Sequence, residues 1–468
     1  MAPSDYVRAR KDASESGDEC FCALVDGLPY FPNLVVAGAI GERDGAIRGV
    51  VSTFLAQQAS AEATTHAPPS SWTVAPITGG NTNALYAVSG LFAADGNGNG
   101  NGNGNDDGGN GNGAARSSSL PPSVLVRLFG AEGMIDRDAE TATYHSLANQ
   151  GLALGWYGRF GNGRIEELLT GFETLTEADL EGGYPRADRD ACAGSNAGTG
   201  LALPPENLNQ EIARKLAQLH STCSVPLHLL DDQGATPTPT LWTQLYPWLE
   251  RSLSATFRNE RDTHRAEREL DPPLSELGAE IDWLRSEVIG GGGDPGKGVI
   301  GFCHNDLLAS NIMMKTSAGE TPGAAAVLEQ LHFIDFEYGG INYYAYDIAN
   351  HFNEYAGGTA EEDHATPNYD RCPSAAEKRV FLEAYAEEYN RHQEKHNDPS
   401  ASTTTVDELE ASVDGFSLAN HLVWGLWGVL QAASEGCEDG LDYLHYAKCR
   451  FARYGHDKKL LLEARRRR

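Results

Sequence analysis

A short stretch in the second half of the chain, "GFCHNDLLASNIMMK", concentrates side chains that could do chemistry. It places His304, Asp306 and Asn311 in an H-x-D-x-x-x-x-N pattern between apolar segments. A carboxylate five residues before an amide, on a loop between short strands, can serve two purposes at one site. The carboxylate can accept a proton from a hydroxyl group, and the amide oxygen can bind a hard cation such as Mg²⁺.

A second ligand for such a cation should follow nearby, and Asp335 in "HFIDFEYGG" comes at the end of the next apolar strand. Magnesium takes oxygen ligands and shares them with substrate phosphates. Asp306 alone could simply cap a turn, but the full set with Asn311 and Asp335 indicates phosphoryl transfer. In that reaction the protein mainly positions the reactants and neutralises phosphate charge, and protein kinases use this order and spacing.

The residues before this site have the pattern of a sheet with one helix. "WTVAPITGGNTNALYAV" predicts two strands joined by a glycine turn, and "SVLVRLFG" predicts a strand with Arg127 on one face. "DRDAETATYHSLANQG" predicts a helix that Asp136 caps, and "WYGRFGNGRIEELLTG" predicts a hairpin. Helical periodicity dominates from "NLNQEIARKLAQLHS" onward, except at "KGVIGFCH", "NIMMK" and "LHFIDFE".

The sequence therefore predicts an α+β, protein-kinase-like fold with two lobes. Residues 71–170 form a small N-terminal lobe with an antiparallel sheet, and residues 171–468 form a larger, mainly helical lobe with the catalytic loop. Residues 1–70 are predicted to be an N-terminal extension with one amphipathic helix in "GAIRGVVSTFLAQQA". The Asn-Gly run at 96–113 has no side chains to bury and is predicted to be a disordered insert.

Three segments, "GFCHNDLLASNIM", "HFIDFEYGGINYYAYDIANHFNEYAG" and "HLVWGLWGVLQA", resemble the choline/ethanolamine kinases, and the resemblance covers about residues 72–455 apart from the insertions. "ITGGNTN", "HNDLL" and "HFNEYAG" are more similar to the ethanolamine kinase branch. The resemblance implies ATP-dependent phosphorylation of ethanolamine, the first step of the CDP-ethanolamine route to phosphatidylethanolamine. A choline kinase or a dual-specific enzyme is the nearest alternative.

The resemblance also implies roles for individual residues. Asp306 matches the catalytic base, and Asn311 and Asp335 match the magnesium ligands. Arg127 matches a phosphate-binding residue with Glu140 as its orienting partner. Asp347 matches an aspartate that braces the catalytic loop. The remaining ATP-binding positions are the tip of the phosphate-covering hairpin and the connector whose backbone would meet adenine: Thr78, Gly79, Gly80 and Asn81, and Glu167, Leu168 and Leu169.

An ethanolammonium or choline substrate needs acidic or aromatic side chains around its cationic group. The candidates are Glu337, Tyr338, Glu354, Trp424, Trp427 and Tyr446. Two tryptophans at i and i+3 share a helix face, which also suits an ordinary core. Carboxylates and aromatic faces attract both amines, so this chemistry alone leaves the choice open. The resemblance favours ethanolamine.

The composition restricts the other classes of function. A net charge of −30 argues against nucleic-acid binding, and it suits either a cationic substrate or simple solubility. Eight cysteines without metal-site spacing indicate a reduced, cytoplasmic protein, and no apolar run is long enough for a membrane span. The sequence leaves the oligomeric state open. A pseudokinase should lack one of the three acidic or amide site residues, and an antibiotic or protein kinase would not need "HFNEY" and "WGLW".

Overall fold

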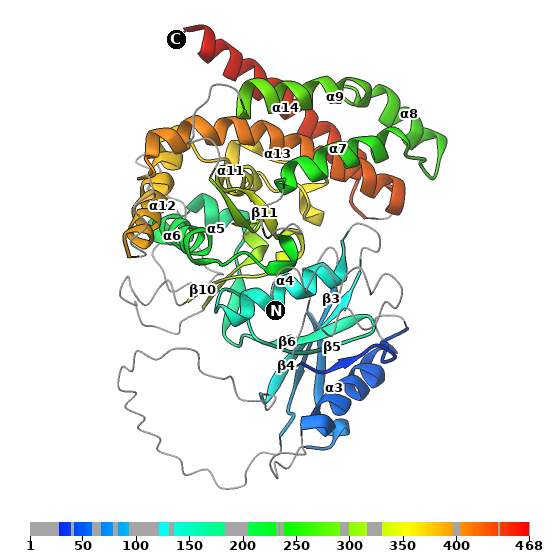
Figure 1. Cartoon of the computed structure of the whole chain (residues 1–468). Helices are drawn as coiled ribbons and strands as arrows, with labels where there is room; N and C mark the ends of the chain where they lie inside the picture. The colour runs from blue at the N-terminus through cyan, green and yellow to red at the C-terminus, as the bar shows by residue number, and fades with distance from the viewer. Residues whose placement is uncertain are drawn as a thin grey trace, which may run out of the picture. The chain divides into compact units, whose positions relative to one another are not determined.

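A computed structural model describes most of the chain, namely residues 28–38, 42–58, 67–77, 83–92, 121–130, 135–182, 205–230, 234, 238–290, 299–315, 330–395, 403–438 and 440–467. The structure divides into two compact units, which Figure 1 draws as ribbons. The smaller unit spans Asp5–Thr170 and the larger one Gly171–Arg468. Each unit is described by itself below.

The smaller unit is built on a six-stranded sheet in the order β1-β5-β6-β4-β3-β2. The pairs are antiparallel except β1 with β5, which is parallel. Its elements are β1 (Tyr30–Phe31), α3 (Asp44–Gln58), β2 (Thr73–Ile77), β3 (Asn83–Ser89), β4 (Ser123–Phe129), α4 (Arg137–Asn149), β5 (Trp156–Phe160) and β6 (Gly163–Glu167). The strands and the helix that the sequence predicted in this region are confirmed.

The two faces of this sheet differ in character. Val124, Val126 and Leu128 of β4 are buried in one apolar core with Val50 and Phe54 of α3, which lies along the sheet in Figure 1. Because side chains alternate along a strand, the residues between them point to the other face. That face carries charged residues opposite α4. The sheet thus has an apolar face under α3 and a charged face under α4.

The N-terminal part of the chain contributes directly to the smaller unit. The predicted amphipathic helix is α3, and its apolar residues Ile47, Val50, Val51, Phe54 and Leu55 are all buried in the core of the sheet. Helix α3, which lies in the predicted extension 1–70, shares this core with strands of the predicted lobe 71–170. The division of these two segments at residue 70 stays a prediction. The insert at 96–113 lies outside the described residues.

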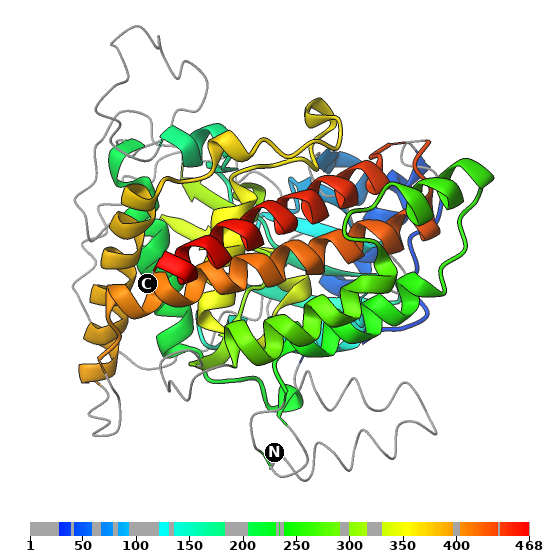
Figure 2. The same ribbon diagram turned by 90° about the horizontal axis from the view of Figure 1, so that it is seen from above.

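The larger unit is mainly helical. Its helices are α5 (Glu177–Gly182), α6 (Pro205–Thr222), α7 (Thr240–Leu253), α8 (Glu260–Arg268), α9 (Leu274–Trp283), α11 (Tyr344–Glu354), α12 (Ala375–Lys395), α13 (Val406–Glu435) and α14 (Tyr443–Arg467). The long helix α13 packs against α14, α11 and α7, and α6 packs against α12. Figure 2 shows α13 and α14 lying side by side. The core of this unit therefore surrounds α13.

Short strands in the larger unit flank the loop that the sequence predicted to be catalytic. One small sheet has the order β10-β9-β7 and a second pairs β11 with β8. Their bounds are β7 (Phe172–Thr174), β8 (Ile300–Cys303), β9 (Ile312–Lys315), β10 (Leu331–Phe333) and β11 (Gly340–Tyr343). The loop after β8, the turn after β10 and helix α11 hold the acidic and amide residues of the sequence motif. The predicted strand segments and the α+β architecture are confirmed.

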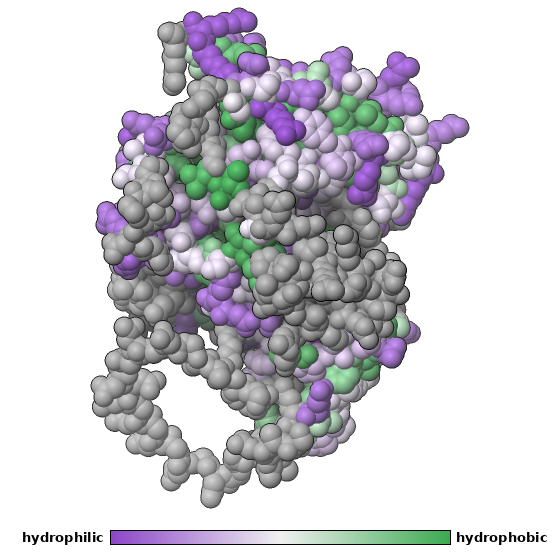
Figure 3. Space-filling model, in the orientation of Figure 1, coloured by the Kyte–Doolittle hydropathy of each residue, from purple (hydrophilic) through white to green (hydrophobic). Residues whose placement is uncertain are grey.

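The surface of the molecule has only scattered exposed apolar side chains among the described residues, such as Val35, Leu253 and Leu460. On the face drawn in Figure 3, hydrophobic groups lie in separate small areas between hydrophilic ones. Among the helices of the described residues, none is both long and apolar enough to cross a bilayer.

Candidate active site

The loop after β8 is fixed by a buried aspartate on α11. Asp347 accepts hydrogen bonds from the backbone N–H groups of His304 and Asn305, each at 2.7 Å, and its Oδ2 lies 3.0 Å from Nε2 of His220. These contacts hold the pKa of Asp347 below its usual value although burial opposes them. Asp347 therefore braces the loop that carries Asp306, as the sequence indicated.

Asn305 connects this loop to the segments that follow. Its backbone is in the left-handed region at φ 65°, which asparagine tolerates better than most residues. Its side chain donates to the carbonyl of Tyr338 at 2.9 Å and accepts from Asn342 at 2.8 Å. These bonds tie the loop to the turn after β10 and to β11.

Asp306 and Asn311 are brought together as the spacing predicted. The amide nitrogen of Asn311 donates to the backbone oxygen of Asp306 at 2.9 Å and lies 3.4 Å from its Oδ2. Since the nitrogen is used in this way, the amide oxygen is the atom left for a cation. Asp335 follows β10 with φ 62° and ψ 59°. Aspartate, like asparagine, tolerates this left-handed region better than most non-glycine residues.

The surroundings of Asp306 are acidic. Burial raises the pKa of Asp306 well above its usual value, and the negative charges of Glu354, Glu337 and Asp335 raise it further. These carboxylates come from two segments of the chain, the turn after β10 and the end of α11. Such a site becomes more stable when it takes up positive charge.

Aromatic side chains next to this acidic group form one cluster. Trp424 contacts the rings of Tyr338 and Trp427 edge to face, with centroids 5.3 and 5.8 Å apart. Trp427 also packs against Tyr446 at 5.9 Å, and its indole N–H donates to the hydroxyl oxygen of Tyr338 at 3.1 Å. The negative charge of Asp306 contributes to the raised pKa values of Tyr338 and Tyr446, after burial and closer charges. The predicted aromatic residues therefore gather near Asp306.

A buried arginine that the sequence interpretation missed joins this region. Arg450 of α14 is fully buried and its Nη1 lies 3.1 Å from Oε1 of Glu354. Its Nη2 donates to Asn420 at 2.7 Å, Asn420 donates to Asn350 at 2.7 Å, and the indole N–H of Trp424 donates to the same Asn350 oxygen at 2.8 Å. A chain of hydrogen bonds thus runs from Glu354 to the aromatic cluster.

Glu354 consequently differs from the simple ammonium counter-ion that the sequence predicted. One of its oxygens is already paired with Arg450, yet burial keeps the pKa of Glu354 above its usual value. The sequence held a weak signal for this pair, because Arg450 falls at helical spacing on a face otherwise made of Tyr446, Ala447 and Tyr454.

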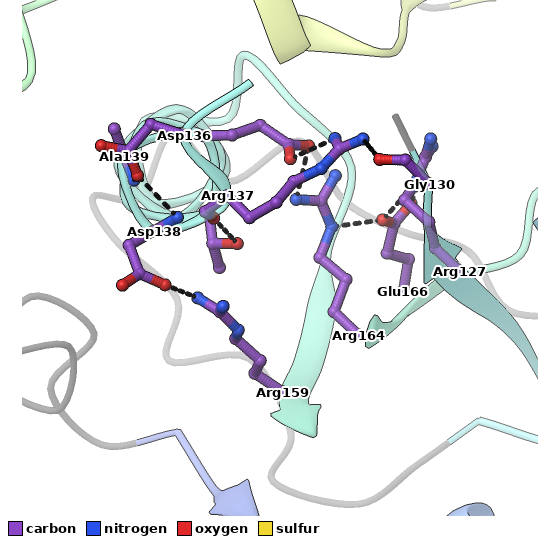
Figure 4. Close-up of polar contacts among 11 residues, drawn as sticks. Arg127, Gly130, Asp136, Arg137, Asp138, Ala139, Arg159, Arg164 and Glu166 are labelled. Carbon is purple, nitrogen blue, oxygen red and sulfur yellow. Dashed lines mark hydrogen bonds and ion pairs between the residues drawn. The ribbon is translucent and has the colours of Figure 1, made fainter. Parts of the chain in front are cut away.

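In the smaller unit, the charged face of the sheet carries the predicted phosphate-binding residue. Arg127 lies opposite Arg164 in register, and Arg164 lies opposite Arg159. Figure 4 shows Glu166 between Arg127 and Arg164. Nε of Arg127 lies 2.7 Å from Oε1 of Glu166. Glu140 is in the same cluster, where it pairs with Arg164 at 2.9 Å and Arg137 at 2.8 Å.

The other predicted ATP-binding positions are partly visible. Thr78, Gly79, Gly80 and Asn81 lie outside the described residues. The backbone N–H of Glu167 donates to the carbonyl of Gly155 at 2.8 Å, so this donor is already used within the sheet. The carbonyl group of Glu167 and the backbone of Leu168 and Leu169 stay the predicted adenine contact, and all three residues are half-buried.

Known proteins resemble this chain over most of its length. A sequence model described as choline/ethanolamine kinase matches residues 74–183 and 201–455. Probable choline kinase 2 of Arabidopsis thaliana is 32% identical over 343 residues, which cover 73% of this chain and 79% of the plant protein. Ethanolamine kinase 1 of Mus musculus is 31% identical over 339 residues, which cover 71% of this chain and 76% of the mouse protein.

Solved structures show the same fold. A choline kinase from Cryptosporidium parvum Iowa II superposes with a TM-score of 0.60 at 22% identity, covering 90% of this chain and 96% of the other. An ethanolamine kinase from Plasmodium vivax superposes with a TM-score of 0.55 at 22% identity, covering 83% and 82%. Because the sequence match includes both the sheet of the smaller unit and the catalytic loop of the larger one, the chain belongs to the choline/ethanolamine kinase family.

Proposed function

We propose that this protein transfers the γ-phosphoryl group of ATP to the hydroxyl group of ethanolamine, with choline as the alternative substrate. The observation that carries the proposal is the position of buried Asp306 among buried and half-buried carboxylates and beside a cluster of tryptophan and tyrosine rings. A small cationic alcohol fits both features, because its charge suits the carboxylates and rings while its hydroxyl group needs a base. Family membership supports a kinase for one or both amines.

Asp306 is the proposed base for the substrate hydroxyl group. Its pKa is raised in the free protein mainly by burial and then by neighbouring carboxylates. A substrate ammonium group near those carboxylates favours the charged form of Asp306, because an opposite charge within a few ångströms lowers the pKa of a carboxyl group. Substrate binding would thus help Asp306 to accept the proton.

Asn311 and Asp335 fit a magnesium ion by their chemistry. Both offer oxygen atoms, and the amide nitrogen of Asn311 is turned toward Asp306. When bound, Mg²⁺ supplies positive charge that neutralises the phosphates during transfer.

Several residues of the smaller unit are proposed to bind ATP. Arg127 presents a planar guanidinium group that suits phosphate oxygens. Thr78, Gly79, Gly80 and Asn81 form the proposed hairpin tip over the phosphates, and the backbone of Leu168 and Leu169 forms the proposed adenine contact. In this proposal residues 71–170 form the lobe that binds the phosphates and residues 171–468 form the lobe with the catalytic loop.

The choice between the two amines depends on hydrogen bonding. Ethanolammonium has three N–H donors that need acceptors when buried, whereas choline has none and relies on aromatic faces. Glu337 and the second oxygen of Glu354 are the proposed acceptors. The similarity of "HNDLL" and "HFNEYAG" to ethanolamine kinases supports ethanolamine, and the cluster of Tyr338, Trp424, Trp427 and Tyr446 supports choline as a second substrate. The phosphatidylethanolamine route and a cytoplasmic location follow as predictions.

Competition between the two amines tests this proposal. Purified protein would receive Mg-ATP with equal concentrations of ethanolamine and choline, and each phosphorylated product would be measured. We expect a higher kcat/KM for ethanolamine and lower but measurable use of choline. Preferential phosphorylation of choline would overturn the choice of amine and leave the kinase assignment in place. ATP consumption with neither amine, but with an aminoglycoside, would overturn the substrate class.

A further inference from the structure

The charged face of the smaller unit's sheet contains an unusual row of like charges. Arg127 of β4, Arg164 of β6 and Arg159 of β5 occupy neighbouring strands at the same level. Like charges directly opposite each other on paired strands are destabilising. Carboxylates must therefore form ion pairs with these arginines to offset their repulsion. Which carboxylate pairs with Arg127 determines the direction of its side chain.

Glu166 lies two residues after Arg164 on β6, so the two side chains share a face of the sheet. Its Oε1 accepts from Nε of Arg127 at 2.7 Å, and its Oε2 lies 3.4 Å from Nη2 of Arg127. Nε of Arg164 donates to the same Oε1. Although burial opposes it, Arg127 and Arg164 hold the pKa of Glu166 below its usual value. Glu166 is thus an ionised carboxylate, and two nitrogens of the Arg127 guanidinium group face its oxygens.

Glu140 of α4 is paired differently. Its Oε1 accepts from Nη1 of Arg164 at 2.9 Å, and its Oε2 accepts from Nη1 of Arg137 at 2.8 Å. Arg127 contributes to the lowered pKa of Glu140 only after Arg164 and Arg137. Arg164 therefore uses separate nitrogens to connect the helix carboxylate with the strand carboxylate.

The stability of the fold alone does not explain this buried network of arginines and glutamates. Arg164 is fully buried, and its Nη2 has no hydrogen-bond partner, although its guanidinium lies 4.4 Å from the centre of the Tyr144 ring. Buried ion networks are often no more stable than apolar residues of similar volume. A network of this kind does, however, fix side-chain directions, because each of its members is held by more than one bond.

We propose that Glu166, and not Glu140, is the residue that positions Arg127 for the phosphates of ATP, with Arg164 holding the other side of the Glu166 carboxylate. The inference rests on the proposed function of Arg127. Glu166 lies on β6, the strand that pairs directly with β4, and on the same sheet face as Arg127. The sheet itself therefore sets the direction of Arg127. The position of α4 then matters less than it would if Glu140 were the direct partner.

The test compares two buried carboxylates of one network. Glu166→Gln and Glu140→Gln each remove one charge that contacts Arg164, so they serve as matched variants. A hydrogen bond to a charged group contributes about 1.5–3 kcal/mol, which corresponds to about 10–100-fold in an equilibrium constant. We expect Glu166→Gln to raise KM for ATP by about tenfold or more, Glu140→Gln to raise it clearly less, and KM for ethanolamine to stay unchanged in both.

A double-mutant cycle distinguishes an effect of Glu166 that acts through Arg127 from a general disturbance of the fold. Once Arg127→Ala has raised KM for ATP, adding Glu166→Gln should raise it little further, because the group that Glu166 positions is gone. Glu166→Asp, which keeps the charge but shortens the side chain, provides the same comparison if Glu166→Gln does not fold. Equal or larger effects of Glu140→Gln would overturn the inference. An unchanged KM for ATP in Arg127→Ala would overturn the proposed function of Arg127 and the inference with it.

Discussion

The two units of this protein each contain a cluster of buried charged residues, but the clusters differ in how well their negative charges are balanced by positive ones. In the smaller unit, arginines hold the pKa values of Glu140 and Glu166 below their usual range despite burial. In the larger unit, burial raises the pKa values of Asp306 and Glu354, and neighbouring carboxylates raise that of Asp306 further. The first cluster supplies its own counter-charges, whereas the second lacks enough of them.

This difference suggests that the cluster in the smaller unit suits an anion and the cluster in the larger unit suits cations. A self-paired network keeps its side chains in fixed directions and can present Arg127 to an anion. A cluster with surplus negative charge becomes more stable when it binds cations, such as a metal ion or a substrate ammonium group. Arg450 reduces the surplus of negative charge in the larger unit at Glu354, with which it pairs. It does not pair with Asp306.

The largest effect is expected at the centre of the acidic cluster. Asp306→Asn keeps the size of the side chain but cannot accept the hydroxyl proton, so turnover should fall by ~10²–10⁴-fold, the usual contribution of a general base. Folding and ATP binding should persist, which thermal denaturation with and without Mg-ATP would show. Asp370→Asn, at an exposed position of the same unit, is the control. Normal turnover in Asp306→Asn would exclude this residue as the base.

Breaking the one arginine pair in the larger cluster should mainly affect stability. Arg450→Met leaves Glu354 buried without its partner, and breaking a buried ion pair costs about 3–5 kcal/mol. Urea denaturation would measure this loss, and Arg450→Met combined with Glu354→Gln should recover part of it. Lys448→Met, on the same helix as Arg450, removes an exposed pair with Glu269 and should lower the free energy of unfolding far less.

Glu354→Gln by itself distinguishes pairing with Arg450 from substrate binding. If Glu354 mainly holds Arg450, Glu354→Gln should reduce stability more than it raises KM for ethanolamine. A rise in KM for ethanolamine without a change in the free energy of unfolding would instead make Glu354 a direct partner of the ammonium group, as the sequence alone predicted.

A buried histidine of the larger unit gives a pH-dependent effect. Burial lowers the pKa of His351 to about 4, while its Nδ1 lies 3.0 Å from the carbonyl oxygen of Leu307. As pH falls through about 6.5, the unfolded chain takes up a proton at this residue and the folded chain does not, so stability falls between about pH 6.5 and 4. This group alone should lower the free energy of unfolding by ~2 kcal/mol between pH 7 and pH 5.

His351→Gln tests this effect, because glutamine can donate to Leu307 but does not titrate in this range. Denaturation midpoints at pH 7 and pH 5 should differ less in the variant than in the unchanged protein. An identical difference in both proteins would show that His351 does not contribute to the pH dependence.

The smallest effect concerns the aromatic cluster. Trp424→Leu removes one aromatic face, and a cation–π contact contributes ~0.5–2 kcal/mol. KM for choline should rise more than KM for ethanolamine, because ethanolammonium keeps its N–H bonds to carboxylates. Trp283→Leu on α9 is the control. An equal rise for both amines would indicate that Trp424 shapes the pocket without contacting the cation.

The sequence by itself was sufficient for the local structure. The alternation in "SVLVRLFG" predicted that Val124, Val126 and Leu128 share one face of β4, and this face packs with α3 in one core. Asp136 caps α4 as expected, by accepting from the N–H groups of Asp138 and Ala139. The spacing of Asp306 and Asn311 predicted that both belong to one site, and the structure brings them into contact, because five residues on a short loop cannot separate them far. These features depend on neighbours in the chain, which the sequence displays directly.

The tertiary structure decided which charged groups form pairs. Arg127 and Glu166 are 39 residues apart, and Glu354 and Arg450 are 96 residues apart. The first contact depends on the register of β4 against β6, and the second on the packing of α11 and α14 around α13. Several carboxylates along the chain could have served each arginine equally well. Only the fold selects among them, because the strength of a charge pair depends on distance and burial, and neither is set by separation in sequence.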